Sequence, residues 1–323
     1  MGRFPEIDVK KLKTHSIRSR RSKVRSAASG KPPAPGASFN AFWKGLPDVL
    51  AVRELRELVG RTAAAVRRKK PVLLLSGAHV IKVGLSPVVI RLMEKGVVSG
   101  VAFNGAGAVH DAELAYFGAT SEEVGSTIRN GRFGMARETA GILNGAASQG
   151  AAGGLGFGEA LGRRILMDAP PFVRSSILAQ AARLGVPVTV HVAMGTDIVH
   201  PHPSADGAAI GETSLRDFRI LAEQVSRLGN GGVVLLFGSA VVLPEVFLKA
   251  LSTARNIRGR VTGFFTASFD MHRPYRPTVN VVERPTADGG KGYTFTGHHE
   301  IMMPLFASAV LEALFSKSRG RGR

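Results

Sequence analysis

Short runs of apolar residues alternate along this chain with segments in which apolar positions recur every three or four residues. The runs PVLLLSG, VSGVAFNG, VPVTVHVAM, GVVLLFGSA and RVTGFFTAS predict buried strands, since they are rich in β-branched residues and leucine and are bounded by glycine or proline. TVNVVERP also has a strand-like pattern. Helical spacing predicts helices over 48–68, 87–95, 175–185, 213–229, 243–256 and 300–315.

This order of strand, helix and strand predicts an α/β fold. We expect a doubly wound, mostly parallel sheet with helices on both faces. Residues 120–165 look helical, and their glycine-rich part AASQGAAGGLGFGEALG is expected to be flexible and able to close over a site.

Much of the positive charge lies near the ends of the chain. Of the net +19, residues 1–31 carry ten Lys or Arg against two acidic residues, and SKSRGRGR ends the sequence. We expect a basic tail and linker over 1–38, a single α/β domain over 39–315, and a basic tail over 316–323. The tails could contact nucleic acid or acidic surfaces weakly, or could serve solubility or packing on a neighbouring subunit.

Cysteine is absent, which excludes disulfides, thiolate catalysis and cysteine-bound metal. No apolar run is long enough to span a membrane, and the N-terminus lacks the apolar core of a secretory signal. These features predict a soluble cytoplasmic protein.

Four predicted strands end in glycine or other small residues, in LLLSGAH, VAFNGAGAVHD, VHVAMGTD and VLLFGSA. Exposed backbone N–H groups beside helix N-termini can bind a pyrophosphate, so a nucleotide ligand is one interpretation. The other is that the glycines only let helices approach the sheet, because the third glycine of the dinucleotide fingerprint is missing.

Histidines and carboxylates gather at predicted strand ends. The stretch GTDIVHPHPSADGAAIGE, residues 195–212, supplies His200, His202, Asp197 and Asp206 directly after a predicted strand. Their spacing matches no metal motif, so we predict no metal site, although a metal-binding cluster stays an alternative. An acidic edge favours a dinucleotide together with a cationic amine substrate. The substrate-binding candidates are Asp206, Asp270, His298, His299 and Glu300.

Four side chains are candidates for catalysis: Lys291, His200, His202 and Glu245. Lys291 lies in the glycine-rich TADGGKGYTFTG, and a desolvated lysine can form an imine with a carbonyl group. His200 or His202 could take the proton that an ammonium group loses before hydride abstraction. The alternatives are an exposed loop lysine, histidines bonded to backbone carbonyls, and a Glu245 that serves the first turn of its helix.

The order of these pieces resembles the deoxyhypusine synthase family over residues 70–315. The pieces are SGAHVIKVGLSPVVIRL, NGAGAVHDAE, VPVTVHVAMGTD, LRDFRILAEQV, VVLLFGSAVV and TGHHEIMMPLFASAV. The resemblance implies a Rossmann-like NAD site, a homotetramer with sites between subunits, and oxidation of a polyamine such as spermidine followed by aminoalkyl transfer. It implies these cofactor contacts: Ser76, Gly77, Asn104, Gly105, Ala106, Gly107, Asp111, Glu113, Asp197, Gly238 and Ser239.

The sequence also departs from the family. The family's histidine after the glycine-rich turn is replaced by Leu243–Glu245, and its Trp-Gly-Lys becomes Gly289-Gly290-Lys291. We therefore expect an NAD-dependent enzyme that abstracts hydride from a polyamine or other amine, with or without aminoalkyl transfer. The alternatives are a metal-assisted hydrolase that uses the histidines and a non-catalytic nucleotide-binding protein.

Overall fold

The computed structural model describes residues 4–316, so all but the first residue of the predicted C-terminal tail lies outside it. Within it the chain divides into two compact units, Met1–Arg53 and Glu54–Arg323. The first unit holds three short 3-10 helices and α1 (Phe39–Gly45), which Ser38 caps. Backbone hydrogen bonds join Lys31 to Gly45 and Asp48 to Ala28, so α1 belongs with the linker that precedes it.

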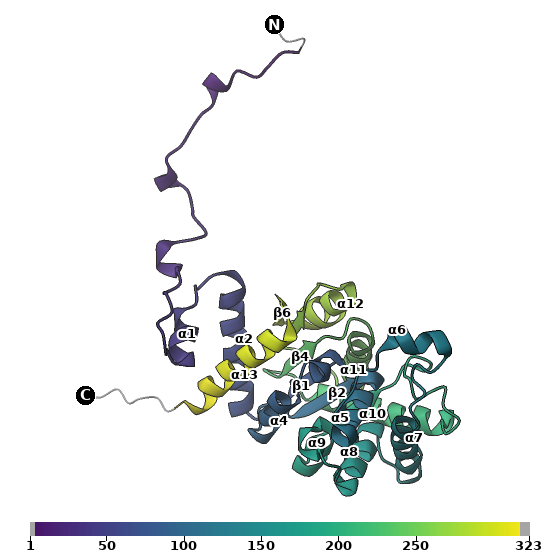
Figure 1. Cartoon of the computed structure of the whole chain (residues 1–323). Coiled ribbons are helices and arrows are strands. Elements are labelled where there is room, and N and C mark those ends of the chain that lie inside the picture. The colour runs from purple at the N-terminus through teal and green to yellow at the C-terminus, as the bar shows by residue number, and fades with distance from the viewer. Residues whose placement is uncertain (1–3, 317–323) are drawn as a thin grey trace, which may run out of the picture. The chain divides into compact units, whose positions relative to one another are not determined.

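The second unit is built on six parallel strands (Figure 1). Their order in the sheet is β3-β2-β1-β4-β5-β6. Their bounds are β1 Val72–Ser76, β2 Gly100–Asn104, β3 Val188–His191, β4 Val233–Phe237, β5 Phe264–Asp270 and β6 Gly290–Thr296. This is the doubly wound order, in which the chain changes direction between β1 and β4. The predicted fold class is confirmed.

Helices cover both faces of the sheet. On one face α10 (Gly207–Ser226) and α11 (Val242–Arg258) pack on alternate strand residues, for example Phe247 against Phe264. On the other, Phe306 of α13 (His299–Phe315) lies 5.7 Å from Phe269 between ring centroids, and Arg61 of α2 (Leu50–Arg67) lies over Phe265. The remaining helices are α3 His79–Lys82, α4 Ser86–Glu94, α5 Gly105–Phe117, α6 Val124–Thr127, α7 Arg137–Ala152, α8 Phe157–Asp168, α9 Ile177–Leu184 and α12 Tyr275–Pro277.

The glycine-rich segment 146–162 runs from the end of α7 into α8, and its glycines in α8 pack closely against β3 and α9. A Cβ on Gly158 would lie 2.3 Å from the carbonyl oxygen of Val188, and one on Gly162 would lie 2.5 Å from that of Leu178. These glycines therefore let α8 approach β3 and α9 more closely than any side chain would allow. The glycines of this segment therefore serve close helix packing, and not the flexible cover over a site that the sequence indicated.

Two predicted elements near the end of the chain are wrong. The strand-like 278–285 forms a π-helix over Thr278–Glu283 and a 3-10 turn over Arg284–Thr286. The expected glycine-rich loop instead contains β6, the edge strand of the sheet. A Cβ on Gly290 would lie 2.1 Å from the carbonyl oxygen of Phe264, so this glycine marks a close approach of two backbones.

Candidate functional site

A cavity of about 370 Å³ opens at the carboxyl edge of β1, β2 and β3. The segments that follow these three strands supply its wall: the end of α3, one face of α5 and the loop after β3. The loop between α5 and α7 closes it. Its lining residues are Lys82, Ala106, Val109, His110, Glu113, Ser121, Glu122, Val124, Phe133, Ala136, Thr196, Asp197 and Ile198.

Helix α5 carries the central side chains of the cavity. Its N-cap is Asn104, whose Oδ1 accepts a hydrogen bond from the backbone N–H of Gly107 at 3.0 Å. Ala106, His110 and Glu113 then follow at intervals of four and three residues, which places them on one face of the helix. That face is the one that lines the cavity.

A chain of three groups connects His110 to Glu113. The Thr120 hydroxyl donates to Glu113 Oε2 at 2.5 Å, and His110 Nδ1 lies 2.5 Å from the same hydroxyl oxygen. Because the single hydroxyl proton points to the carboxylate, Nδ1 must be the donor, and His110 then keeps its lone pair on Nε2. Thr139 donates to the other oxygen of Glu113 at 3.0 Å. We call His110, Thr120 and Glu113 the relay.

Burial keeps His110 neutral. Desolvation lowers the pKa of this imidazole from 6.5, Lys82 lowers it further, and the nearby Glu113 carboxylate only partly opposes them. Only 17% of the His110 side chain and 15% of the Glu113 side chain is exposed. The relay thus holds an unprotonated nitrogen base in a partly desolvated cavity, which is the state a general base requires near neutral pH.

Asp197 lies across the cavity against the first residue of α5. A Cβ on Gly105 would lie 1.8 Å from Asp197 Oδ2, so the carboxylate fills the space that the missing side chain leaves. The positive end of the helix dipole favours an anion here. Burial raises the pKa of Asp197, and His200 partly offsets this effect.

His200 orients the Asp197 loop. Its Nδ1 accepts the backbone N–H groups of Gly195 and Asp197 at 3.1 and 3.2 Å, which places its proton on Nε2, 3.7 Å from Asp197 Oδ2. The Nδ1 lone pair of His200 is therefore in use, which does not favour the predicted role of His200 as a base; that role stays a prediction. His202 Nδ1 likewise accepts from the backbone N–H of Ser204 within its own turn, and Asp206 caps α10.

A second group of predicted residues lies beside the ends of β1 and β4, where the strand order of the sheet reverses. A Cβ on Gly77 would lie 2.1 Å from the carbonyl oxygen of Gly238, so these two loops touch through their backbones. His299 is only 2% exposed; its Nε2 contacts the carbonyl oxygen of Phe269 at 3.1 Å, and its buried Nδ1 has no partner among the described residues. His79, at the start of α3, stacks edge-on against His299 at 5.4 Å.

Asp111 points away from the cavity although it is only two residues from Glu113. Its carboxylate accepts from the Ser176 hydroxyl at 2.6 Å and from the N–H groups of Ile177 and Leu178 at 2.7 and 3.1 Å. It is 1% exposed, and burial raises its pKa to about 6. Asp111 therefore holds the N-terminus of α9 in place, and its predicted contact with the cofactor ribose stays a prediction that these hydrogen bonds do not favour.

Lys291 and Glu245 also lie apart from the cavity. Lys291 is the second residue of β6, at the amino edge of the sheet, and its Nζ donates to Glu57 at 2.6 Å. Glu245 lies in the first turn of α11 and pairs with Arg276 at 3.2 Å. Neither residue lines the cavity beside α5. Their assignment as catalytic residues stays a prediction, and the structure does not bring them together with the relay.

The remaining predicted residues make contacts within their own elements or are exposed. Ser76 ends β1 and is buried, Gly107 packs on the Phe103 ring, and the Ser239 hydroxyl accepts the N–H of Leu243 at the start of α11. Asp270 ends β5 and accepts from the His272 backbone, while His298 and Glu300 are exposed at the start of α13. The structure brings together Ala106, Glu113 and Asp197 of the predicted set. Sequence reasoning did not assign Lys82, His110, Thr120, Glu122 or Thr139 to the site.

The described residues offer no set of side chains that could hold a metal ion. Among residues 4–316 no three His, Asp or Glu side chains come together as a metal would require. No helix within the same range is long and apolar enough to cross a membrane.

The predicted NAD contacts fit a dinucleotide at one of two places. At the N-terminus of α5, Asp197 already occupies the position where a pyrophosphate would lie, so two anions would compete there. Beside β1 and β4 the fit is better, because small residues flank the point where the strand order reverses and the buried His299 Nδ1 lacks a partner.

Comparison with known proteins gives a likeness of fold. Neither a family model nor a curated protein matches the sequence. Among solved structures, AgrE in complex with ornithine and NAD+ matches with a TM-score of 0.52 and 17% identity, over 83% of this chain and 34% of that chain. A conserved Methanococcus maripaludis S2 protein described as LOR/SDH matches with a TM-score of 0.50 and 13% identity, over 81% and 70%.

An Entamoeba histolytica protein described as a deoxyhypusine synthase matches with a TM-score of 0.49 and 10% identity, over 85% of this chain and 93% of that one, too low to carry an argument. The chain spans about a third of the length of AgrE and of ArgZ, a cyanobacterial arginine dihydrolase that also matches. Identities this low relate the chain to these proteins by fold alone.

Proposed function

We propose that this protein is an NAD-dependent enzyme that oxidises a small amine in the cavity beside α5. The observation that carries the proposal is the relay: it leaves the lone pair of His110 on Nε2, and His110 lines a cavity whose other charged groups are mainly carboxylates. The fold supports the cofactor, because a protein of the same fold, AgrE, has been solved with NAD+ and ornithine.

Carboxylates would recognise the positive charge of the substrate. Glu113, Glu122 and Asp197 line the cavity together with a single lysine, Lys82. The backbone N–H of Gly134 fixes Glu122 Oε2 at 2.9 Å, and His200 fixes Asp197. A bound ammonium would favour the ionised form of Asp197, whose pKa burial otherwise raises. An anionic substrate would meet repulsion at the same three side chains.

His110 would take the ammonium proton, because an amine must lose that proton before its carbon can release hydride. The imidazolium that forms would be stabilised through the Thr120 hydroxyl by the Glu113 carboxylate. Gly238, Ser239 and His299 would hold NAD, which would supply the hydride acceptor when bound. Helix α3 connects the two places, since His79 at its start contacts His299 and Lys82 at its end lines the cavity.

The proposal stops at oxidation and does not include aminoalkyl transfer, since Lys291 is bonded to Glu57 at the opposite edge of the sheet. The homotetramer implied by the family resemblance stays a prediction. Light scattering of the purified full chain at micromolar concentration tests it, and a monomer would argue against a site shared between subunits.

The test is NADH formation by the purified chain with a panel of mono-, di- and polyamines and basic amino acids. His110→Gln should abolish turnover while leaving the melting temperature and NAD affinity unchanged, because glutamine keeps a polar group but cannot act as the base. His202→Gln is the matched control, since His202 bonds only within its own turn, and it should retain turnover. Equal loss in both variants, or full activity in His110→Gln, would refute the assignment. Binding of NAD without any turnover would favour the non-catalytic alternative.

A further inference from the structure

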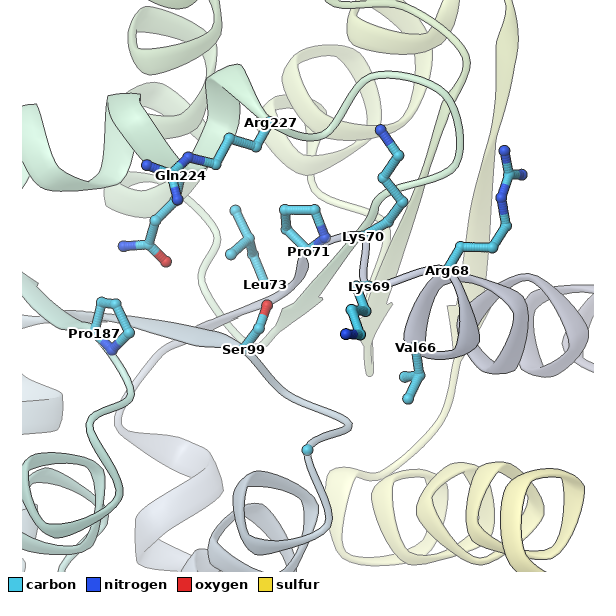
Figure 2. A pocket seen from close by; sticks show the side chains of 11 residues that line it. Val66, Arg68, Lys69, Lys70, Pro71, Leu73, Ser99, Pro187, Gln224 and Arg227 are labelled. Atoms are coloured by element: carbon cyan, nitrogen blue, oxygen red, sulfur yellow. The ribbon is translucent and has the colours of Figure 1, made fainter.

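A second cavity lies at the opposite edge of the sheet, where the strands begin. Pro71, Ser99 and Pro187 directly precede β1, β2 and β3 and form its floor, and the cavity has a volume of about 770 Å³. Figure 2 shows Gln224 of α10 and Arg227 directly after that helix on one side, and Val66 of α2 with Arg68 and Lys69 directly after that helix on the other, with the Arg68 side chain extending away from the floor. We call it the amino-edge pocket.

The amino-edge pocket is basic. Its lining contains Arg68, Lys69, Lys70 and Arg227 and not one acidic side chain. Lys70 donates to the carbonyl of Gly229 at 2.8 Å, and Arg227 pairs with Glu223 at 2.8 Å. Within residues 4–316, by contrast, Arg68 and Lys69 make no ion pair. Arg68 and Lys69 therefore add two positive charges to the lining of this pocket that have no ion-pair partner among the described residues.

Helix dipoles neutralise only part of these charges. Helices α2, α4, α9 and α10 all end at this edge, and each C-terminus carries about half a negative charge. Together these termini balance about two cations. Since four basic side chains line the pocket and Arg227 is paired with Glu223, an excess of about one positive charge remains.

Gln224 places an unpaired amide at the pocket. Its side-chain Oε1 and Nε2 are buried and have no hydrogen-bond partner in the described part of the chain, and Oε1 fills the space beside Gly100, where a Cβ would lie 1.9 Å from it. Lys69 has φ 53° because it terminates α2, where the N–H of Lys70 bonds the carbonyl oxygen of Ala65 at 2.9 Å. An unpaired amide beside a basic lining is an arrangement that a ligand with several acceptor oxygens would satisfy.

We propose that the amino-edge pocket binds a small phosphate-bearing molecule. Phosphate matches lysine and arginine as a donor set, and its ester or hydroxyl groups could pair with the Gln224 amide. The volume lies within the range of about 300–1,000 Å³ that is usual for small-molecule sites. The inference is independent of the amine reaction, since it uses no residue of the relay or of the cavity beside α5.

Calorimetry of the full chain with inorganic pyrophosphate and with a hexose bisphosphate tests the inference. The hexose bisphosphate does not resemble NAD. Pyrophosphate is part of NAD, so its binding is assigned to this pocket only if the substitutions below weaken it while NAD affinity stays unchanged. Arg68→Gln/Lys69→Asn should weaken binding about tenfold or more, with asparagine chosen because it tolerates the left-handed backbone. Gln224→Leu should weaken it without changing the charge. Arg174→Gln/Arg219→Gln removes two exposed charges elsewhere and should leave affinity within about twofold.

Failure of both probes to bind the unaltered chain would overturn the proposal, as would equal weakening by the control pair. A labelled single-stranded oligonucleotide provides a further arm. If it binds and neither small probe displaces it, the basic edge is a nucleic-acid surface and the proposal is wrong. Amine turnover should be the same in all three variants, so a failure here is distinct from a failure of the proposed reaction.

Discussion

The free energy of unfolding should fall as pH rises because of Asp217, and the substitution Asp217→Asn should abolish this fall. Asp217 lies on α10 and is fully buried, and its Oδ2 accepts the N–H groups of Val190 and Gly158 at 2.7 and 2.8 Å. Its Oδ1 has no partner in the part of the chain that the structure describes. Burial raises the pKa of this carboxyl from 3.8 to about 7, despite the two backbone donors.

The direction of this change with pH follows from the number of protons that the folded and unfolded chains bind. Between pH 3.8 and about 7 the folded protein holds a proton on Asp217 that the unfolded chain has lost, so its free energy of unfolding falls as pH rises through this range. A difference of about three pKa units corresponds to at most about 4 kcal/mol. Asparagine keeps an oxygen that can accept both N–H groups but never ionises.

Urea denaturation followed by circular dichroism at pH 5 and pH 9 measures the effect. Asp217→Asn should exceed the stability of the unaltered protein by about 1.6 kcal/mol at pH 5 and by up to about 4 kcal/mol at pH 9, because ionisation of the unfolded chain begins near pH 3.8. Asp111, whose pKa is also raised, is present in both proteins, so its contribution cancels. Asp288→Asn, at an exposed position, is the control. The reasoning fails if the difference between the two proteins is the same at both pH values.

Three further substitutions test packing and the site. Gly158→Ala should lower the free energy of unfolding by about 1–3 kcal/mol in denaturant titration, because its Cβ would lie 2.3 Å from the Val188 carbonyl oxygen. Gly60→Ala, with nothing within 4 Å in the middle of α2, should raise it by about 0.4–1 kcal/mol, and a loss there would contradict the reasoning. Gly105→Ala should displace Asp197 and raise the KM for an amine, with only a small change in melting temperature. An unchanged KM would show that Asp197 does not contact the substrate.

The strands of the sheet could be predicted because they are buried on both faces. Such strands are continuous apolar runs, and VLLLS and VVLLF show all five residues buried. The edge strand β6 lacks this signal, since exposed and buried positions mix in GKGYTFT. In 278–285 the β-branched valines indicate a strand, but Pro277 and Pro285 flank a segment that packs as a π-helix with Val281 in the core. Local preference there is overridden by tertiary contacts.

The helical part of the site could have been read more closely from the sequence. Successive residues of an α-helix turn by about 100°, so Asp111 and Glu113 differ by about 200° and cannot face one ligand. Ala106, His110 and Glu113 share a face by the same rule. The periodicity of α5 therefore selects His110 and Glu113 and excludes Asp111 without any structure.

The rest of the relay has no such signal. Thr120 and Glu122 come from the loop after α5, and Thr139 comes from α7 beyond it, so only the folded chain brings them to Glu113 or the cavity. The same holds for Asp197, which meets α5 because Gly105 has no side chain. A histidine-rich stretch drew attention to His200 and His202, but their Nδ1 atoms accept backbone N–H groups of their own loop. A histidine can act as a base only where its lone pair is free, and hydrogen-bond direction, which a sequence does not contain, decides this for His110 and against His200.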